Sequence, residues 1–236
     1  MRRILTLLMI IAVSGAAAQE RFDYVFRRNP WNGGPNAAGI RQDSLSRSYA
    51  EIYFTKETGG MTGHSSSDDS WNAGARTESV RHLKNVSFAG GFEYDYFDGR
   101  NMCGSMFTQP GYYPVDILEF TPSRKIREDY SFMGGVSAVL GRRWTGGLRV
   151  EFEAQNYAKR KDLRHKNTRL DFEFSPGVMY HAGRFAAGTV YIVGTNSEKL
   201  EAEEIGSTPE SYQAFFDRGL GYGSLQLWES SDMHLT

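Results

Sequence analysis

The stretch from Trp144 to Tyr157 constrains the fold more than any other part of this 236-residue chain. Alternate residues are apolar or small in one set and mostly polar or charged in the other. The first set is Trp144, Gly146, Leu148, Val150, Phe152 and Ala154, and the second is Thr145, Gly147, Arg149, Glu151, Glu153 and Gln155. Successive side chains of a strand point to opposite faces, so this stretch predicts a β-strand with one apolar and one charged face. Its length is close to the roughly 9–11 residues that a tilted strand needs to cross a bilayer.

Residues 1–18 have the composition of an export signal. A basic start, Arg2-Arg3, precedes an apolar stretch from Ile4 to Val13. Small residues at 16–18 then form a cleavage site. We therefore expect a signal peptide over residues 1–18 and a mature chain that begins near Gln19.

The mature chain begins with a turn-rich segment and contains no candidate membrane helix. Residues 19–47 are interrupted by Gly and Pro, and they predict a periplasmic lead-in that is either tucked into a barrel mouth or mobile. No later segment approaches the roughly 20 apolar residues of a membrane helix. An exported chain of this kind is either soluble or an outer-membrane barrel.

Alternation elsewhere predicts six further strands. They cover residues 48–55, 77–83, 86–96, 130–140, 169–181 and 184–195. Residues 98–129 are apolar but contain Pro110, Pro114 and Pro122, so they predict an irregular connection rather than one long strand. A connection of this length either folds over or into the barrel, or only packs on neighbouring loops.

The predicted connections alternate in length, which indicates a membrane barrel. Links of about two to three residues follow the second, fourth and sixth strands, whereas links of about ten to thirty follow the others. Short periplasmic turns and long external loops are typical of outer-membrane barrels, and a lipocalin-like soluble barrel is the alternative. Aromatic residues near strand ends fit interfacial girdles. They are Tyr130, Trp144, Tyr157, Tyr180 and Tyr191.

These patterns predict an all-β protein, a transmembrane antiparallel up-and-down β-barrel over residues 48–236. Five sequence blocks strengthen this interpretation. The blocks are Arg28–Asn32, Gly104–Phe107, Pro110–Asp116, Glu119–Pro122 and Phe215–Gly221. Together they resemble an uncharacterised outer-membrane β-barrel family of Bacteroidota, domain of unknown function 6850. The resemblance implies an outer-membrane barrel and assigns no activity and no site residue.

The resemblance covers nearly the whole mature chain but differs from the family at its end. Members run to about twice this length, and barrels of this class close on a strand that ends in an aromatic residue. The present chain ends at Leu235-Thr236. Seven strands and an uncertain eighth also fit poorly with the even strand numbers of bacterial barrels. We therefore expect the N-terminal half of a larger barrel, incomplete at its C-terminus.

If the apolar faces meet lipid, the charged faces line a lumen. The candidate lumen-facing residues are Glu93, Asp95, Arg149, Glu151, Glu153, Asp171 and Glu173, with Arg169 beside them. Carboxylates outnumber guanidinium groups, and such a lining favours cations. The alternative is a closed network in which basic residues of the missing half pair with these carboxylates.

A basic segment follows the central strand. The candidate external basic loop contains Lys159, Arg160, Lys161, Arg164 and Lys166. It could hold phosphates of outer-leaflet lipid or another anionic ligand. The plainer alternatives are attraction to the acidic loop near Glu201 or simple solvation. Outer-membrane lipid is the expected partner, together with a surface lipoprotein or another outer-membrane component. A net charge of −1 gives no reason to expect nucleic acid.

The sequence does not predict an enzyme. Its five histidines are scattered, and it contains no nucleophile elbow, nucleotide loop or His-Glu-x-x-His motif. We therefore expect no catalytic residue, metal or cofactor. The first hypothesis is a channel or transport component of unknown substrate. The second is a surface binding or structural barrel with a closed lumen, and an outer-membrane hydrolase comes third.

Overall fold

The computed structural model describes residues 34–60, 63, 65–203, 213–220, 222–227 and 231–235. These residues form one short 3-10 helix, η1 (Ala37–Gln42), and an antiparallel sheet. The strands are β1 (Arg47–Thr58), β2 (Asp69–His82), β3 (Val86–Ser105), β4 (Asp116–Val139), β5 (Trp144–Lys159), β6 (Arg164–Ala182), β7 (Phe185–Val190), β8 (Val193–Glu203), β9 (Gln213–Asp217), β10 (Gly223–Leu227) and β11 (Ser231–Leu235). Within the described part of the chain, no helix has the length and hydropathy needed to cross a membrane. The predicted signal peptide and most of the lead-in fall outside the described residues.

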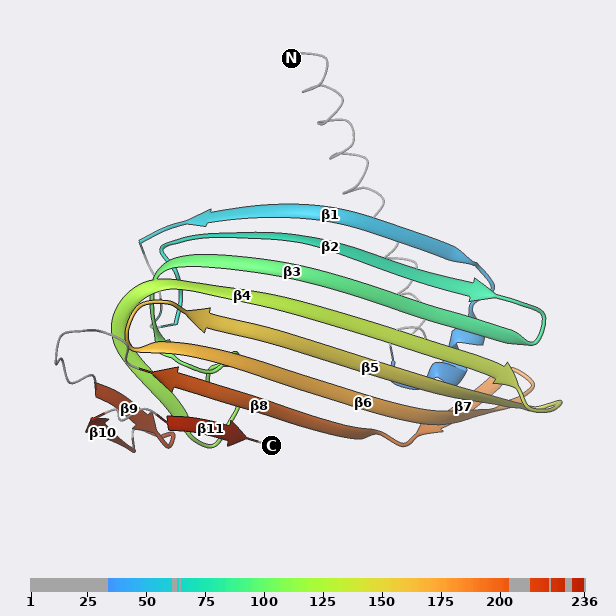
Figure 1. Cartoon of the computed structure of the whole chain (residues 1–236). Helices are drawn as coiled ribbons and strands as arrows, with labels where there is room; N and C mark the ends of the chain where they lie inside the picture. The colour runs from blue at the N-terminus through green and yellow to red at the C-terminus, as the bar shows by residue number, and fades with distance from the viewer. Residues whose placement is uncertain are drawn as a thin grey trace, which may run out of the picture.

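The strands follow one another as a curved antiparallel meander (Figure 1). β1 to β6 pair in chain order, and β7 and β8 pair with successive parts of β6. β11 continues the sheet beside β8, whereas β9 pairs with the start of β4 and carries β10. The prediction of an all-β antiparallel sheet is therefore confirmed. Among the described residues, no ladder joins β1 to β8 or β11, so hydrogen bonds do not close the sheet into a barrel.

The two ends of the sheet differ in their connections. Residues 83–85, 140–143 and 183–184 form tight turns at what we call the turn end, on the right in Figure 1. Residues 59–68, 106–115 and 160–163 connect strands at the opposite, loop end. The short turns agree with the sequence prediction. The long irregular connections were overestimated, because β3 extends to Ser105, β4 begins at Asp116 and β6 begins at Arg164.

The irregular connection predicted over residues 98–129 is present but confined to residues 106–115, which contain Pro110 and Pro114. Pro122 shows why its extent was overestimated. This proline lies inside β4, where a proline was expected to end the strand. The β3–β4 ladder is irregular there, with register shifts on either side of Met102, and pairing with β5 begins only at Lys125. A proline is tolerated where a bulge or a free edge leaves no ladder partner for its missing N–H.

Ladder register separates the residues into two faces. We call the face on which η1 packs the inner face and the opposite one the outer face. Four phenylalanines lie directly side by side on the outer face, one from each of β3 to β6, and all are exposed. They are Phe92, Phe132, Phe152 and Phe172. The buried apolar residues instead gather at the two ends of the inner face.

Aromatic pairs border this apolar outer face at both ends. At the turn end, the rings of Trp144 and Tyr180 lie 4.8 Å apart. Towards the loop end, Trp71 lies 5.1 Å from Tyr96. Tyr157 was predicted to belong to such a border, but it faces inwards and is buried beside His165, because odd-numbered residues of β5 point to the inner face.

Candidate functional site

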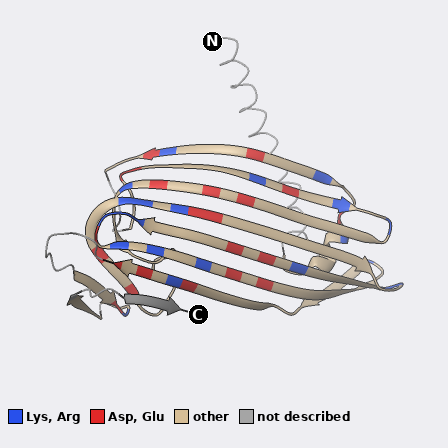
Figure 2. Ribbon diagram, in the orientation of Figure 1, with Lys and Arg blue, Asp and Glu red and all other residues tan. Residues whose placement is uncertain are grey.

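A band of charged side chains crosses the middle of the inner face. Ladder register places Glu93, Glu153 and Asp171 in one row across β3 to β6, with Ser131 between the first two. The adjacent row contains Glu151 beside Glu173. Figure 2 shows acidic and basic residues crossing the strands at this level. All seven predicted lumen-facing residues lie on this face, so the structure brings them together as one surface, which we call the charged band.

Four arginines hold the charged band together through partners two residues along the same strand. Residues two apart in a strand share a face, so each guanidinium lies next to its own carboxylate. The pairs are Arg76 with Glu78, Arg127 with Asp129, Arg149 with Glu151, and Arg169 with Asp171. Arg127 Nε lies 2.8 Å from Asp129 Oδ2. The prediction missed Arg76, Glu78, Arg127 and Asp129, although a repeated Arg-x-Glu or Arg-x-Asp spacing in strands could have revealed them.

Uncharged side chains donate hydrogen bonds to most of the carboxylates that do not belong to these four pairs. Tyr53 Oη donates to Asp95 at 2.8 Å and to Glu93 at 3.3 Å. Asn72 Nδ2 donates to Asp95 at 3.2 Å, and Ser175 Oγ donates to Glu173 at 2.8 Å. Tyrosine, asparagine and serine bring no positive charge, so the band keeps a net negative charge.

Three neighbouring hollows lie along the inner face. One of about 240 Å³ near the loop end is lined by serines and aromatic rings. It shares Arg127 with a second hollow of about 430 Å³, which in turn shares Glu93 and Glu153 with a third of about 330 Å³. The last two contain eight carboxylates and three arginines of the band, with Arg169 bonded at its edge. The arrangement is an acidic surface that can attract cations.

A cap, which we define as residues 106–119, 163, 198–202 and 214, covers part of the inner face at the loop end. Its apolar part is Met106, Phe107, Ile117, Leu163, Leu200, Ala202 and Ala214. Under it lies a fully buried ion cluster in which Glu119 pairs with both Lys125 and Lys159. Lys125 Nζ is 3.1 Å from Glu119 Oε1 and donates to Ser105 O at 2.9 Å. Burial lowers the pKa of both lysines, and Glu119 opposes that shift.

A second buried polar chain connects the cap to β6 and β8. The carboxylate of Glu198 accepts from the backbone N–H and the hydroxyl of Thr108, at 2.9 and 3.1 Å. It also accepts from Asn167 Nδ2 at 2.8 Å, so Asn167 Oδ1 faces the Nδ1 of His165 at 2.9 Å. That assignment makes Nδ1 the protonated ring nitrogen and leaves Nε2 buried without a hydrogen-bond partner. Burial, followed by the charge of Lys125, holds the pKa of His165 well below its usual range.

The residues of the predicted external basic loop are divided by the structure. Lys159 ends β5 and is buried against Glu119, whereas Arg160 and Lys161 lie in the short connection. Arg164 pairs with Asp162 at 2.7 Å, and Lys166 is exposed on the outer face of β6. The set is therefore not one loop surface, because β5 and β6 extend nearly to its centre.

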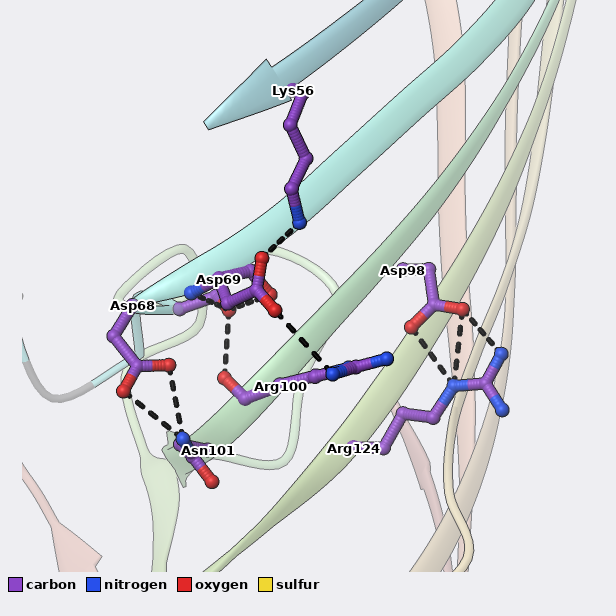
Figure 3. Close-up of polar contacts among 8 residues, drawn as sticks. Lys56, Asp68, Asp69, Asp98, Arg100, Asn101 and Arg124 are labelled. Atoms are coloured by element: carbon purple, nitrogen blue, oxygen red, sulfur yellow. Dashed lines mark hydrogen bonds and ion pairs between the residues drawn. The ribbon is translucent and has the colours of Figure 1, made fainter. Parts of the chain in front are cut away.

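Charged residues reappear on the outer face at the loop end. Lys56 and Arg100 both pair with Asp69, and Arg124 Nε donates to the two oxygens of Asp98 at 2.8 and 3.0 Å (Figure 3). Asn101 Nδ2 donates to Asp68 in the adjoining connection. These ion pairs begin just beyond Trp71 and Tyr96, so they mark where the apolar outer face ends.

Comparison with known proteins identifies a family without an assigned activity. The model of a family of unknown function (DUF6850) matches residues 37–233. Searches of curated proteins and of solved structures gave no match. In the part of the chain that the structure describes, no group of three or more His, Cys, Asp or Glu residues could hold a metal ion.

Proposed function

This chain belongs to the family of unknown function DUF6850, and we propose that it forms the wall of an outer-membrane β-barrel whose inner face lines a cation-favouring channel or transport path. The substrate is left open. The charged band is the observation that carries this proposal.

The outer face supports contact with lipid. Every outer-face residue from Val86 to Tyr96 in β3 and from Tyr130 to Ala138 in β4 is uncharged, as is Leu140 just beyond β4. Ten residue steps at about 3.4 Å span about 34 Å, which a strand tilted by 35–45° turns into roughly 25 Å of height. That height equals the apolar band of known outer-membrane barrels. The bordering aromatic pairs and the rim of ion pairs in Figure 3 fit the two interfaces.

The open edges of the sheet must be paired in such an environment. An unsatisfied backbone group costs several kcal/mol in hydrocarbon, so a lipid-exposed edge strand is not tolerated. The edge of β1 has no ladder partner among the described residues. We therefore propose that further strands close the barrel, and that they come from the same polypeptide or from a second copy.

The inner face supports the transport of cations. Eight carboxylates and four guanidinium groups meet in the charged band, so four negative charges remain after one-to-one pairing. Rings of Asp and Glu side chains select cations in pores. The carboxylates line two neighbouring hollows, so this excess charge extends along the strands instead of lying at one point.

A second candidate function is a structural or binding barrel with a closed lumen. Its specific support is that both ends of the inner face are occupied, by η1 at the turn end and by the cap at the loop end. In that case the charged band is an internal scaffold, and the surface connections at the loop end engage a partner.

Single-channel recording of the full chain in planar bilayers separates the two candidates. Neutralising Glu151 and Glu153 together (E151Q/E153Q) removes two carboxylates and leaves Arg149 and Arg169 less compensated, so the cation-to-anion permeability ratio is expected to fall severalfold. Glu128→Gln is the matched control, because Glu128 lies on the outer face of the neighbouring strand. A folded protein that stays electrically silent, also after release of η1, favours the closed barrel.

A further inference from the structure

The turn end of the inner face is covered by a segment of the chain that precedes the first strand. Residues 34–42, comprising Gly34, Pro35, Asn36 and η1, lie against β3 to β6. Arg149 of the charged band donates from Nη1 to Gly34 O at 3.2 Å. Because Arg149 also lines the last of the three hollows, this segment stands where the acidic path reaches the turn end.

The segment rests on glycines that leave no room for a side chain. A Cβ added at Gly147 would lie 2.0 Å from the backbone nitrogen of Ala38. A Cβ at Gly177 would lie 2.3 Å from Asn36 Oδ1. A glycine in a strand weakens the strand itself, and it is expected where another backbone approaches closely. These two glycines are therefore a seat for the segment.

Polar contacts fix the segment on this seat. Asn36 Nδ2 donates to Thr189 O at 3.0 Å and to Val178 O at 3.3 Å, and Asn36 Oδ1 accepts from Ala38 N. Ser137 Oγ donates to Ala38 O at 3.2 Å. The buried apolar contribution is small, since the cluster at this end contains only Ala37, Ile40 and Val80 among the described residues.

We infer that residues 34–42 are a releasable plug that closes the turn end of the channel. The inference rests on the proposed function. Without the plug, this end of the inner face is lined mostly by small residues, with Val80 and Met179 as its larger apolar side chains. Departure of the plug therefore exposes little apolar surface and opens the acidic path. The small lining residues are Ser87, Ala89, Gly135, Ser137, Gly147 and Gly177.

Chemical labelling combined with conductance tests the plug. In a Cys103→Ser background, Ile40→Cys places a reporter thiol at a buried position of η1. We expect Gly147→Ala to raise the rate of maleimide labelling at position 40 at least tenfold and to raise the open probability in planar bilayers. Gly90→Ala is the matched control, because the nearest atom to its Cβ, the carbonyl oxygen of Met133, is 3.7 Å away. Asn36→Ala is the second variant if G147A does not fold, since it removes contacts of the segment and leaves the strands unchanged.

The outcomes separate the plug from the channel. Faster labelling together with higher open probability in G147A or N36A supports the plug. A conducting wild type whose labelling or current does not change in these variants overturns the plug and leaves the channel standing. Wild type and variants that all stay silent, although labelling at position 40 is faster, overturn the channel and with it the role of the plug.

Discussion

The cap and the plug occupy opposite ends of the same inner face, but they are held by different interactions. The cap combines a cluster of large apolar side chains with the fully buried ion cluster around Glu119. The plug contacts glycines, is fixed by hydrogen bonds that involve Gly34, Asn36, Ala38, Arg41 and Gln42, and buries only small or medium apolar side chains of its own. Burial of large apolar side chains makes separation of the cap costly, whereas the plug buries little apolar area.

This difference indicates which end of the inner face can move. The cap includes parts of β4, β8 and β9, so its separation requires the strands themselves to open. The plug precedes β1 and shares no ladder with the sheet, so it can leave while the strands stay paired. Regions with few buried contacts open at a lower free energy than the global unfolding. If the lumen conducts, the turn end is therefore the end that opens.

The largest effect is expected from Glu119→Ala in the cap. Removing the carboxylate leaves Lys125 and Lys159 buried without their shared partner, and breaking a buried ion pair in this way costs about 3–5 kcal/mol. Urea unfolding of the protein in phospholipid vesicles measures this loss. The cost should shrink towards pH 10, because uncharged lysines no longer need the carboxylate.

Lys56→Ala is the matched control for this prediction. Its ion pair with Asp69 is largely exposed to water, so the pair is screened and its loss should change the free energy of unfolding much less than the loss of Glu119. If the two substitutions changed the free energy of unfolding equally, the cap would be held no more firmly than the surface, and the contrast between cap and plug would be contradicted.

The repeating parts of the fold could be predicted from the sequence, whereas the cap could not. Alternation in residues 86–96 and 144–157 predicted the strands and their two faces, because a period of two follows directly from strand geometry. The cap depends on contacts between Phe107, Leu163 and Leu200, which are far apart in sequence and lie outside the alternating stretches. No local pattern marks such contacts.

The candidate site, like the fold, could be predicted where its residues lie in alternating stretches and not elsewhere. Glu151 and Glu173 were assigned to the inner face from alternation alone, and register then placed them side by side. Arg76 was missed because its strand was thought to begin at Thr77, one residue after it. Lys159 was expected to be exposed because a run of basic residues usually is, and its buried partner Glu119 lies forty positions away.

A pH-dependent effect of intermediate size is expected from His165. Burial depresses the pKa of the folded-state imidazole well below the unfolded value of about 6.5, so the neutral ring is favoured in the folded protein. Its contribution to stability is therefore full above pH 6.5 and is lost progressively as the pH falls towards the folded-state pKa, at up to about 1.4 kcal/mol per pH unit. Urea midpoints measured between pH 7.5 and pH 5 reveal this slope.

His165→Gln isolates this contribution, because glutamine does not titrate. The variant is expected to show a smaller decrease in stability over the same pH range, whatever its stability at pH 7.5. Equal slopes in variant and wild type would mean that the imidazole reaches water, and the cap would then be looser than its burial implies.

The smallest effect on global stability is expected from Ile40→Ala in the plug. Ile40 is as buried as many core residues, and an Ile→Ala change in a core costs about 2–5 kcal/mol. A segment that detaches before the sheet unfolds contributes nothing to global stability beyond its own docking free energy. We therefore expect the free energy of unfolding, obtained from urea titration, to fall by less than about 0.5 kcal/mol. Hydrogen exchange at Gly39, whose N–H bonds to Asn36 O, should nevertheless become severalfold faster. A loss of global stability typical of a core residue would instead make η1 an integral part of the wall. The two ends of the inner face would then differ in composition and not in mobility.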